Sequence, residues 1–165
     1  MVTPKKFKQI DEALKWACEA ESTDELRSRV RAISLGNSIL MRFVAWGVGY
    51  EQGPYNLPDG ETPYKDEGLP PNMADTTITQ EFRRILTLLP EGSAKNLPQW
   101  RREEIWMQIC QGVQKNEAVL LDLVKDQNLL EAYPKLADVL ESFLGGWKKP
   151  EVKKKKSPKK SSTTL

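Results

Sequence analysis

Apolar residues recur every three or four positions along most of the chain, which is the period of an amphipathic α-helix. The first run ends near residues 19–21 and consists of Phe7, Ile10, Leu14 and Ala17. The next four residues, Ser22–Glu25, have the spacing of a capping box, in which the serine hydroxyl accepts a backbone N–H and the glutamate reaches back. They predict a second helix, whose apolar face is Leu26, Val30 and Ile33.

The third predicted helix is apolar on nearly every side. Gly36 and Asn37 end the second helix, and Ser38 is placed to cap the next one. Residues 39–50 then contain a single charged residue, Arg42. Because this helix has no polar face to present to water, we expect it at the centre of the core.

Two more helical runs precede residue 113. Residues 77–89 form the first, which Pro90 closes, and its apolar stripe is Ile78, Phe82, Ile85 and Leu89. Pro98 stands at a first-turn position of the second, which Gly112 ends. The apolar residues of this helix that are available for burial are Trp100, Ile105, Met107 and Ile109.

Two last helices complete the pattern. Asn116 is placed to cap residues 117–127, and Pro134 begins a helix that the glycines at 145 and 146 stop. The inward face of that last helix is Leu136, Val139, Leu140 and Phe143. No alternating strand pattern of comparable length competes. The sequence therefore predicts an all-α fold, a compact bundle of about six or seven short helices over residues 1–146.

One segment, residues 51–76, interrupts this pattern, and we call it the strap. Its prolines, at positions 54, 58, 63, 70 and 71, oppose helix and favour extended geometry. It contains six acidic residues and one lysine, Lys65, and it is much longer than the usual connection in a helical bundle. We interpret it as a structural crossover, with a protein-binding epitope as the alternative. The side chains that can anchor it to the bundle are Tyr55, Leu57, Tyr64 and Leu69.

Composition argues against several classes of enzyme. The chain has no histidine, which removes the commonest general base, the Ser-His-Asp and Cys-His arrangements and the usual nitrogen ligand of zinc or iron. The adjacent Glu103 and Glu104 point about 100° apart on a helix, so they do not converge on one substrate. Glycine-rich phosphate-binding loops are absent from the sequence. We expect no enzymatic activity, no cofactor, no metal and no small-molecule substrate.

Hydropathy and cysteine usage indicate a soluble protein of the cell interior. The longest apolar stretch, residues 39–50, is too short to span a bilayer. Cys18 and Cys110 are widely separated and lack metal-binding spacing, so we interpret them as reduced, buried thiols.

Charge is divided unevenly between the body and the C-terminus. Residues 147–165 hold eight lysines and one glutamate, a net charge of +7, whereas residues 1–146 carry −5. This segment has too few apolar residues to offset the entropy cost of ordering, so we predict a disordered tail. Lysine clusters release counterions from phosphates without reading bases, which predicts non-specific contact with DNA or RNA. The eight lysines are Lys148, Lys149, Lys153, Lys154, Lys155, Lys156, Lys159 and Lys160.

Three stretches carry a resemblance to a known family. Residues 57–65 (LPDGETPYK), 101–129 (RREEIWMQICQGVQKNEAVLLDLVKDQNL) and 133–146 (YPKLADVLESFLGG) resemble blocks of an uncharacterised family of small tailed-bacteriophage proteins, many of them marine and cyanobacterial. The similarity covers nearly all of residues 7–146. It departs from the family at residues 61–63, where the family has two adjacent prolines. The resemblance implies a phage protein acting in the cytoplasm of an infected bacterium, and it implies no catalytic residue because the family has no assigned function.

Two functions remain open. The first is a non-enzymatic phage accessory protein that associates non-specifically with nucleic acid through its tail. The alternative is an adaptor for a host or phage protein, in which the tail only keeps the protein soluble. Against contact with nucleic acid we also weigh a tail that folds back on the acidic strap. Aromatic side chains are frequent anchors at such interfaces, and the candidates are Tyr55, Tyr64, Trp100 and Trp106, together with Trp147. A helix-turn-helix around Gly112 is disfavoured, because Glu117 and Asp122 on its second helix would repel phosphate.

Overall fold

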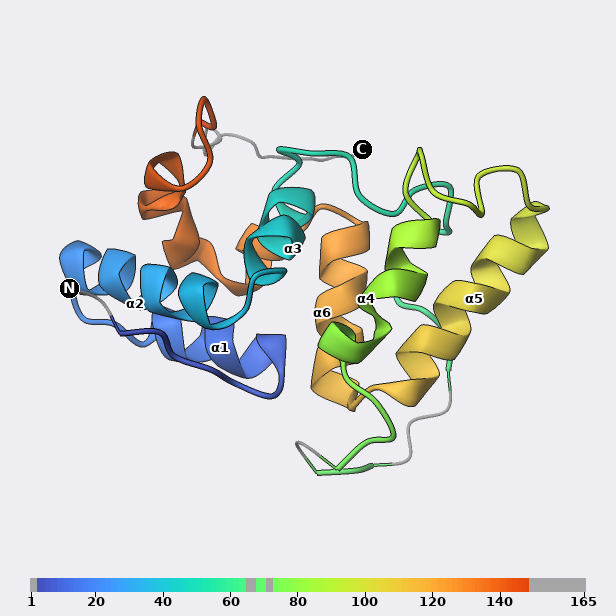
Figure 1. Cartoon of the computed structure of the whole chain (residues 1–165), viewed down its shortest axis with the longest axis horizontal. Coiled ribbons are helices and arrows are strands. Elements are labelled where there is room, and N and C mark those ends of the chain that lie inside the picture. Colours follow the sequence, from blue (N-terminus) through green and yellow to red (C-terminus); the bar gives the residue numbers. More distant parts are fainter. Residues whose placement is uncertain (1–2, 65–67, 71–72, 149–165) are drawn as a thin grey trace, which may run out of the picture.

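The structure, a computed structural model, describes residues 3–64, 68–70 and 73–148. These residues form seven α-helices and two short 3₁₀ helices and contain no strand, so the all-α prediction is confirmed for this part of the chain (Figure 1). None of these helices is both long enough and apolar enough to cross a bilayer. The predicted tail lies outside the described residues except for Trp147 and Lys148.

Helix α6 is the helix around which the others are arranged. It packs against α1, α3, α5 and α7, while α1 also packs against α2 and α4 against α5. Figure 1 shows α1 and α2 on one side of α6, and α4 and α5 on the other. In chain order the helices are α1 (Ile10–Cys18), α2 (Thr23–Gly36), α3 (Leu40–Gly47), α4 (Ile78–Thr87), α5 (Gln99–Gly112), α6 (Lys115–Lys125), α7 (Leu129–Ala132), η1 (Pro134–Asp138) and η2 (Leu140–Ser142).

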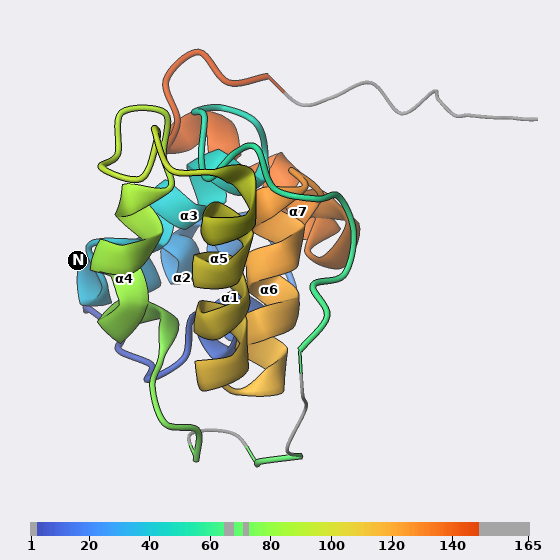
Figure 2. The ribbon, with the colours of Figure 1, turned by 90° about the vertical axis from the view of Figure 1, so that its right-hand side faces the viewer.

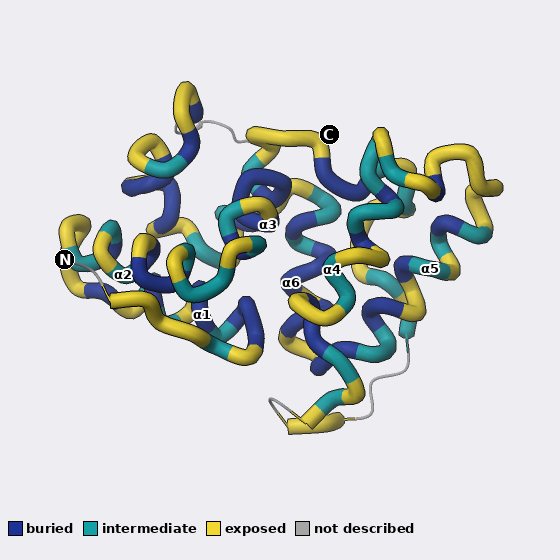
Figure 3. The backbone as a smooth tube through the Cα atoms, in the orientation of Figure 1, coloured by how far each residue is buried: buried dark blue, intermediate teal, exposed yellow. Residues whose placement is uncertain are grey.

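Helix α3 is buried as predicted, since six of its eight residues are inaccessible to water. Its aromatic side chains meet α4: the ring centroids of Phe43 and Trp46 lie 5.8 and 6.2 Å from that of Phe82. Figure 3 shows α3 and α6 as largely buried stretches of the backbone. The apolar pattern of residues 39–50 therefore located this part of the core correctly.

The predicted N-terminal cap of α2 is partly confirmed, and that of α3 is wrong. The Ser22 hydroxyl accepts the N–H of Glu25 at 3.1 Å, as expected, but the Glu25 carboxylate accepts the N–H of Glu21 rather than that of Ser22. Ser38 does not cap α3 as predicted. The helix begins at Leu40 without a side-chain cap, and the Asn37 side chain accepts the N–H of Ile39 instead.

Two predictions about the last helices were wrong. Gln114, not Asn116, caps α6, because its side chain accepts the N–H of Asn116. The single helix expected from Pro134 onward is replaced by η1 and η2. The buried residues there are Leu136, Ala137, Val139 and Leu140, which form two pairs three positions apart. A 3₁₀ helix aligns side chains at that spacing, and both pairs begin in η1 and end at or just before the start of η2.

Helix α5 turns a different face inward from the one predicted. Trp100 and Met107 are 66% and 39% exposed, although both were expected to be available for burial. Ile109 is buried as predicted, but it shares its face with Arg102 and Trp106, which were not among the residues expected there. At 100° per residue these three share one face, and Trp100 points to the opposite side.

A buried carboxylate, Glu117 of α6, joins three helices. One of its oxygens accepts the N–H of Ile10 and the other accepts the N–H of Ile78, each at 3.1 Å. Ile10 and Ile78 are the first residues of α1 and α4, where the helix dipole favours negative charge. The side chain of Glu117 therefore fixes where both helices begin relative to α6.

Burial raises the pKa of Glu117 to about 7, and the two N–H donors oppose this shift. Asp11 and Glu12, at the start of α1, add a smaller contribution in the direction of burial. Glu117 therefore changes charge near neutral pH in the folded protein.

We expect the free energy of unfolding to fall as the pH rises from about 5 to about 8. The pKa of Glu117 is about 7 in the folded protein and 4.5 for the unperturbed group, so the folded protein binds the extra proton between these values. The stabilisation is complete below the unfolded value and is lost as the pH rises through the folded one. The loss is about 3 kcal/mol, measurable by urea unfolding at the two pH values.

Glu117→Gln should flatten this pH dependence. It should also lower stability at acidic pH, because an amide N–H₂ then faces one of the two backbone N–H groups. The matched control is Glu25→Gln. The pKa of Glu25 is lowered, chiefly by the hydrogen bond from the Glu21 N–H, so its contribution is lost only in acid. If the free energy of unfolding of Glu117→Gln still fell with pH as steeply as that of the wild type, the pH dependence would belong to another group.

Candidate binding surface

Helices α5 and α6 together hold the strap at Thr62. The carboxylate of Asp122, buried on α6, accepts the backbone N–H of Thr62 at 2.8 Å and its hydroxyl at 2.5 Å. The indole N–H of Trp106 on α5 donates to the same hydroxyl at 3.0 Å. Figure 2 shows the strap passing along the outer side of α6 before it returns to α4.

A second set of contacts holds the strap near the end of α6. The ammonium group of Lys125 donates to the carbonyl oxygens of Pro58 and Gly60, at 2.7 and 3.0 Å. The carboxylate of Asp126 accepts the N–H of Gly60 at 3.0 Å and pairs with Lys125. Gly60 has a φ of +87°, a conformation that favours glycine, so the strap makes its turn where α6 offers these partners.

The third and most buried contact is made by Arg102. Its guanidinium group is 1% exposed and donates to the carbonyl oxygens of Leu88, Ala94 and Tyr55, at 3.0, 3.0 and 2.6 Å. The ring of Tyr55 lies 4.8 Å from the same group. Leu88 follows the last turn of α4, where the helix dipole favours a cation. Arg102 thus joins α4, the α4–α5 connection and the strap through backbone oxygens.

Two small pockets lie beside strap residues 57–63, each of about 180 Å³. The first, between the strap and α5, is lined by Leu57, Pro58, Glu61, Thr62, Pro63, Glu103, Trp106 and Met107. The second, between the strap and α6, is lined by Gly60, Glu61, Val119, Asp122, Leu123 and Asp126. Among the described residues, no lysine or arginine lines either pocket. The first pocket therefore has an apolar wall and two carboxylates, and we call it the strap pocket.

The structure separates the aromatic candidates by exposure. Tyr55 and Tyr64 are half-buried, and Tyr64 packs against the hydrophobic core. Trp106 is 2% exposed and contributes to the wall of the strap pocket, while Trp147 is 8% exposed and belongs to the core. Trp100, in contrast, has most of its surface in contact with water.

The remaining candidates lie in less informative places. Leu57 packs against the core, whereas Leu69 is 39% exposed and is held through its carbonyl, which accepts from the Gln114 side chain. Lys148 is exposed. The other seven tail lysines, from Lys149 to Lys160, lie outside the described residues.

Three residues of this surface were missed by sequence reasoning. Arg102 carries a usable signal, because it stands four and seven residues before Trp106 and Ile109 on the buried stripe of α5. The sequence around Asp122 gives no such signal, because an aspartate on a helix is normally exposed to solvent. Met107 was assigned to the core on its residue type, although its angular position on α5 places it outside.

The two cysteines are free, and their surroundings suppress the thiolate form. Burial raises the pKa of Cys110 to about 12 and that of Cys18 to about 11. A reactive cysteine requires a lowered pKa and access to solvent. Neither thiol is prepared to act as a nucleophile at neutral pH.

Replacing Arg102 by methionine should destabilise the protein by about 3 kcal/mol or more, because three carbonyl oxygens lose their donor. The strap should also detach from the body, because the carbonyl oxygen of Tyr55 is one of the three that Arg102 binds. Chemical denaturation measures the first effect, and limited proteolysis within residues 53–64 measures the second.

Arg101→Met is the matched control, one residue away on the same helix. Arg101 is half-exposed and pairs with Glu104 on the surface, so its loss should change stability by no more than about 0.5 kcal/mol. If the two variants were equally stable and equally resistant to protease, Arg102 would not be what holds the strap.

Comparison with known proteins places the chain in a family whose function is unknown. Residues 40–131, more than half of the chain, match the family of unknown function DUF6433. No curated protein and no solved structure matches the chain. The matched residues run from α3 into α7 and include the strap, Arg102 and Glu117. The chain belongs to DUF6433, an uncharacterised family.

Proposed function

We propose that this protein is a non-enzymatic adaptor that binds a partner protein on the strap and the adjoining exposed face of α5. The observation that carries the proposal is Trp100, which is 66% exposed on this face. Met107 stands seven residues later on the same side of the helix and lines the strap pocket. An exposed tryptophan beside an apolar pocket is typical of the centre of a protein interface.

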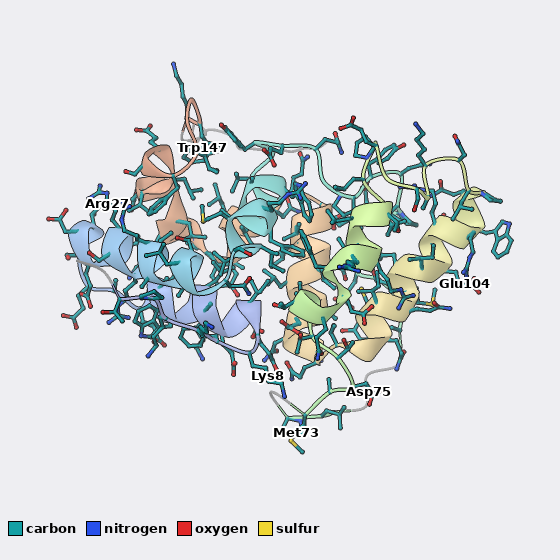
Figure 4. All side chains as sticks on the ribbon, viewed as in Figure 1. Lys8, Arg27, Met73, Asp75, Glu104 and Trp147 are labelled. Carbon is teal, nitrogen blue, oxygen red and sulfur yellow. The ribbon has the colours of Figure 1, made fainter. Side chains whose placement is uncertain are left out.

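The charge of this face favours a basic partner surface. Glu61 and Glu103 line the strap pocket. Glu104 also lies on the outer side of α5 (Figure 4) and pairs with Arg101. Complementary charge steers association and selects against acidic partners.

The assignment as a non-enzymatic protein is supported by how the buried polar groups are used. Glu117 and Asp122 accept hydrogen bonds that position helices and the strap. The pKa values of both cysteines are raised. These groups are therefore committed to structure or held in an unreactive form.

We further propose that the protein comes from a tailed bacteriophage and acts in the cytoplasm of the infected bacterium. The resemblance of residues 57–65, 101–129 and 133–146 to small phage proteins supports this origin. The partner is then a host or a phage protein.

Trp100→Ala should abolish capture of the partner while leaving the fold intact. Loss of an interface hot spot costs about 2 kcal/mol or more, which is roughly a thirtyfold loss of affinity. The experiment is a pulldown from infected cells with the tagged full-length protein, with and without nuclease, quantified by mass spectrometry. Leu35→Ala is the matched control, because Leu35 is 58% exposed on α2, away from the strap.

The adaptor proposal requires one protein that the wild type and Leu35→Ala retain after nuclease treatment and that Trp100→Ala loses. Equal retention by Trp100→Ala would remove the α5 face from the interface. Loss of every captured protein on nuclease treatment would favour the second candidate function.

That second candidate is non-specific association with DNA or RNA through the lysine-rich tail. Its support is the charge distribution: residues 147–165 carry +7, against −5 for residues 1–146. Lysines without arginine provide electrostatic contact with phosphates and no base recognition. The two functions are compatible because they use different parts of the chain.

If about six of the eight tail lysines contact phosphates, log affinity for duplex DNA should fall against log salt with a slope of roughly −5. Raising salt from about 50 to about 200 mM should then weaken binding on the order of a thousandfold. Deletion from Lys148 onward should abolish binding and preserve helical content, because Trp147 is the last buried residue described. Equal binding by the deleted protein would exclude the tail as the contact.

A further inference from the structure

We propose that the strap pocket binds a lysine side chain of this chain's own C-terminal segment, residues 148–160, so that the tail occupies the adaptor face in the absence of a partner. The inference rests on the proposed function in taking this face as a docking surface. It goes further in naming an occupant that the chain itself supplies.

Electrostatics is the first argument. The two small pockets beside strap residues 57–63 are lined by carboxylates, and no lysine or arginine of the described residues lines either one. Asp122 and Asp126 are already committed to strap contacts. The carboxylates through which the strap pocket can receive a cation are Glu61, which lines both pockets, and Glu103, one of whose oxygens also accepts from the side chain of Gln99 at 2.9 Å. Since opposite charges attract most strongly beside apolar walls, a basic side chain is the favoured occupant.

The apolar wall of the strap pocket favours a lysine side chain. The remaining wall of the strap pocket is mostly apolar and consists of Leu57, Pro58, Pro63, Trp106 and Met107. A lysine buries its four methylene groups along such a wall and keeps its ammonium group at the rim, where Glu61 and Glu103 stand. The tail offers eight lysines and no arginine.

The position of the last described residues brings the tail near the strap. The hydroxyl of Tyr50, which immediately precedes the strap, donates to the carbonyl of Gly145 at 2.6 Å. Trp147 is then buried, which fixes the point from which the tail leaves the body. Figure 2 shows the C-terminal 3₁₀ segment and the start of the strap at the same end of the molecule.

Reach is sufficient for contact within one chain. Residues 153–160 are five to twelve positions beyond Lys148, which corresponds to about 17 to 42 Å of extended chain. A compact body of this size has a radius of gyration of about 15 Å. A tail lysine can therefore arrive at the strap pocket without unfolding any described element.

This contact makes the tail a competitor for the adaptor face. A basic partner surface must displace the tail lysines from the strap pocket, and nucleic acid that captures the tail exposes the pocket. The two candidate activities are then coupled through one charged contact, which weakens as salt rises.

Zero-length carbodiimide cross-linking of the purified full-length protein tests the proposal. The reagent joins a carboxylate to an amine only where the two are in contact, and mass spectrometry identifies the pairs. We expect cross-links from residues 148–160 to Glu61 or Glu103 at least tenfold more abundant than those to Glu19 and Glu131, two exposed carboxylates at the end of α1 and on α7. They should disappear at about 0.5 M salt.

Two variants separate a built pocket from general attraction between a basic tail and an acidic body. Met107→Ser removes part of the apolar wall without touching a carboxylate and should reduce the Glu61 and Glu103 cross-links severalfold. Leu35→Ser, at a similarly exposed apolar position on α2, should leave them unchanged. An even distribution over exposed carboxylates, or no effect of Met107→Ser, would overturn the proposal.

Mixing equal amounts of unlabelled and ¹⁵N-labelled protein identifies the chain that supplies the tail. Cross-linked pairs should carry a single label, as expected for contact within one chain. Pairs that combine both labels would overturn the proposal in favour of the tail of a second copy. Because the experiment contains no partner and no nucleic acid, its failure is distinct from failure of partner capture through Trp100.

Discussion

Helix α4 is held at each end by a buried ionisable side chain that hydrogen-bonds to its backbone, and the position of the strap depends on this arrangement. Glu117 accepts the N–H of Ile78 at the amino end, and Arg102 donates to the carbonyl of Leu88 at the carboxyl end. Both side chains come from other helices, α6 and α5. The three helices are thereby locked to one another, and they form the platform on which the strap lies.

Backbone groups, rather than side chains of opposite charge, are the hydrogen-bond partners of these two residues, although the buried Nε of Arg102 has no partner among the described residues. A buried ion pair can lose either partner by substitution, which leaves an uncompensated charge. Here the N–H groups of Ile10 and Ile78 remain with any side chain except proline, and the carbonyls of Leu88, Ala94 and Tyr55 remain with any side chain. These hydrogen bonds are therefore sensitive to substitution at Arg102 and Glu117, whereas at the buried partner positions packing in the core is the stronger constraint.

Local sequence patterns predicted the helices well and their contacts poorly. Periodicity located α3 and α4 because their buried residues are apolar and regularly spaced. It failed on α5, where a buried arginine occupies the inward stripe and a tryptophan faces water. The prolines of the strap correctly predicted the lack of helix in its described residues, but its docking depends on Asp122, sixty positions after Thr62. No short-range pattern encodes a contact over that separation.

The contact between Glu117 and Ile10 has a consequence for how much of the chain constitutes a folding unit. The family match begins at residue 40, the first residue of α3, whereas Ile10 and the rest of α1 lie outside it. A fragment restricted to residues 40–131 would lose the donor to one oxygen of Glu117 and would expose the side of α6 that α1 covers. The matched range and the packed unit are thus different lengths of chain, and the N-terminal helices complete a core that residues 40–131 do not contain by themselves.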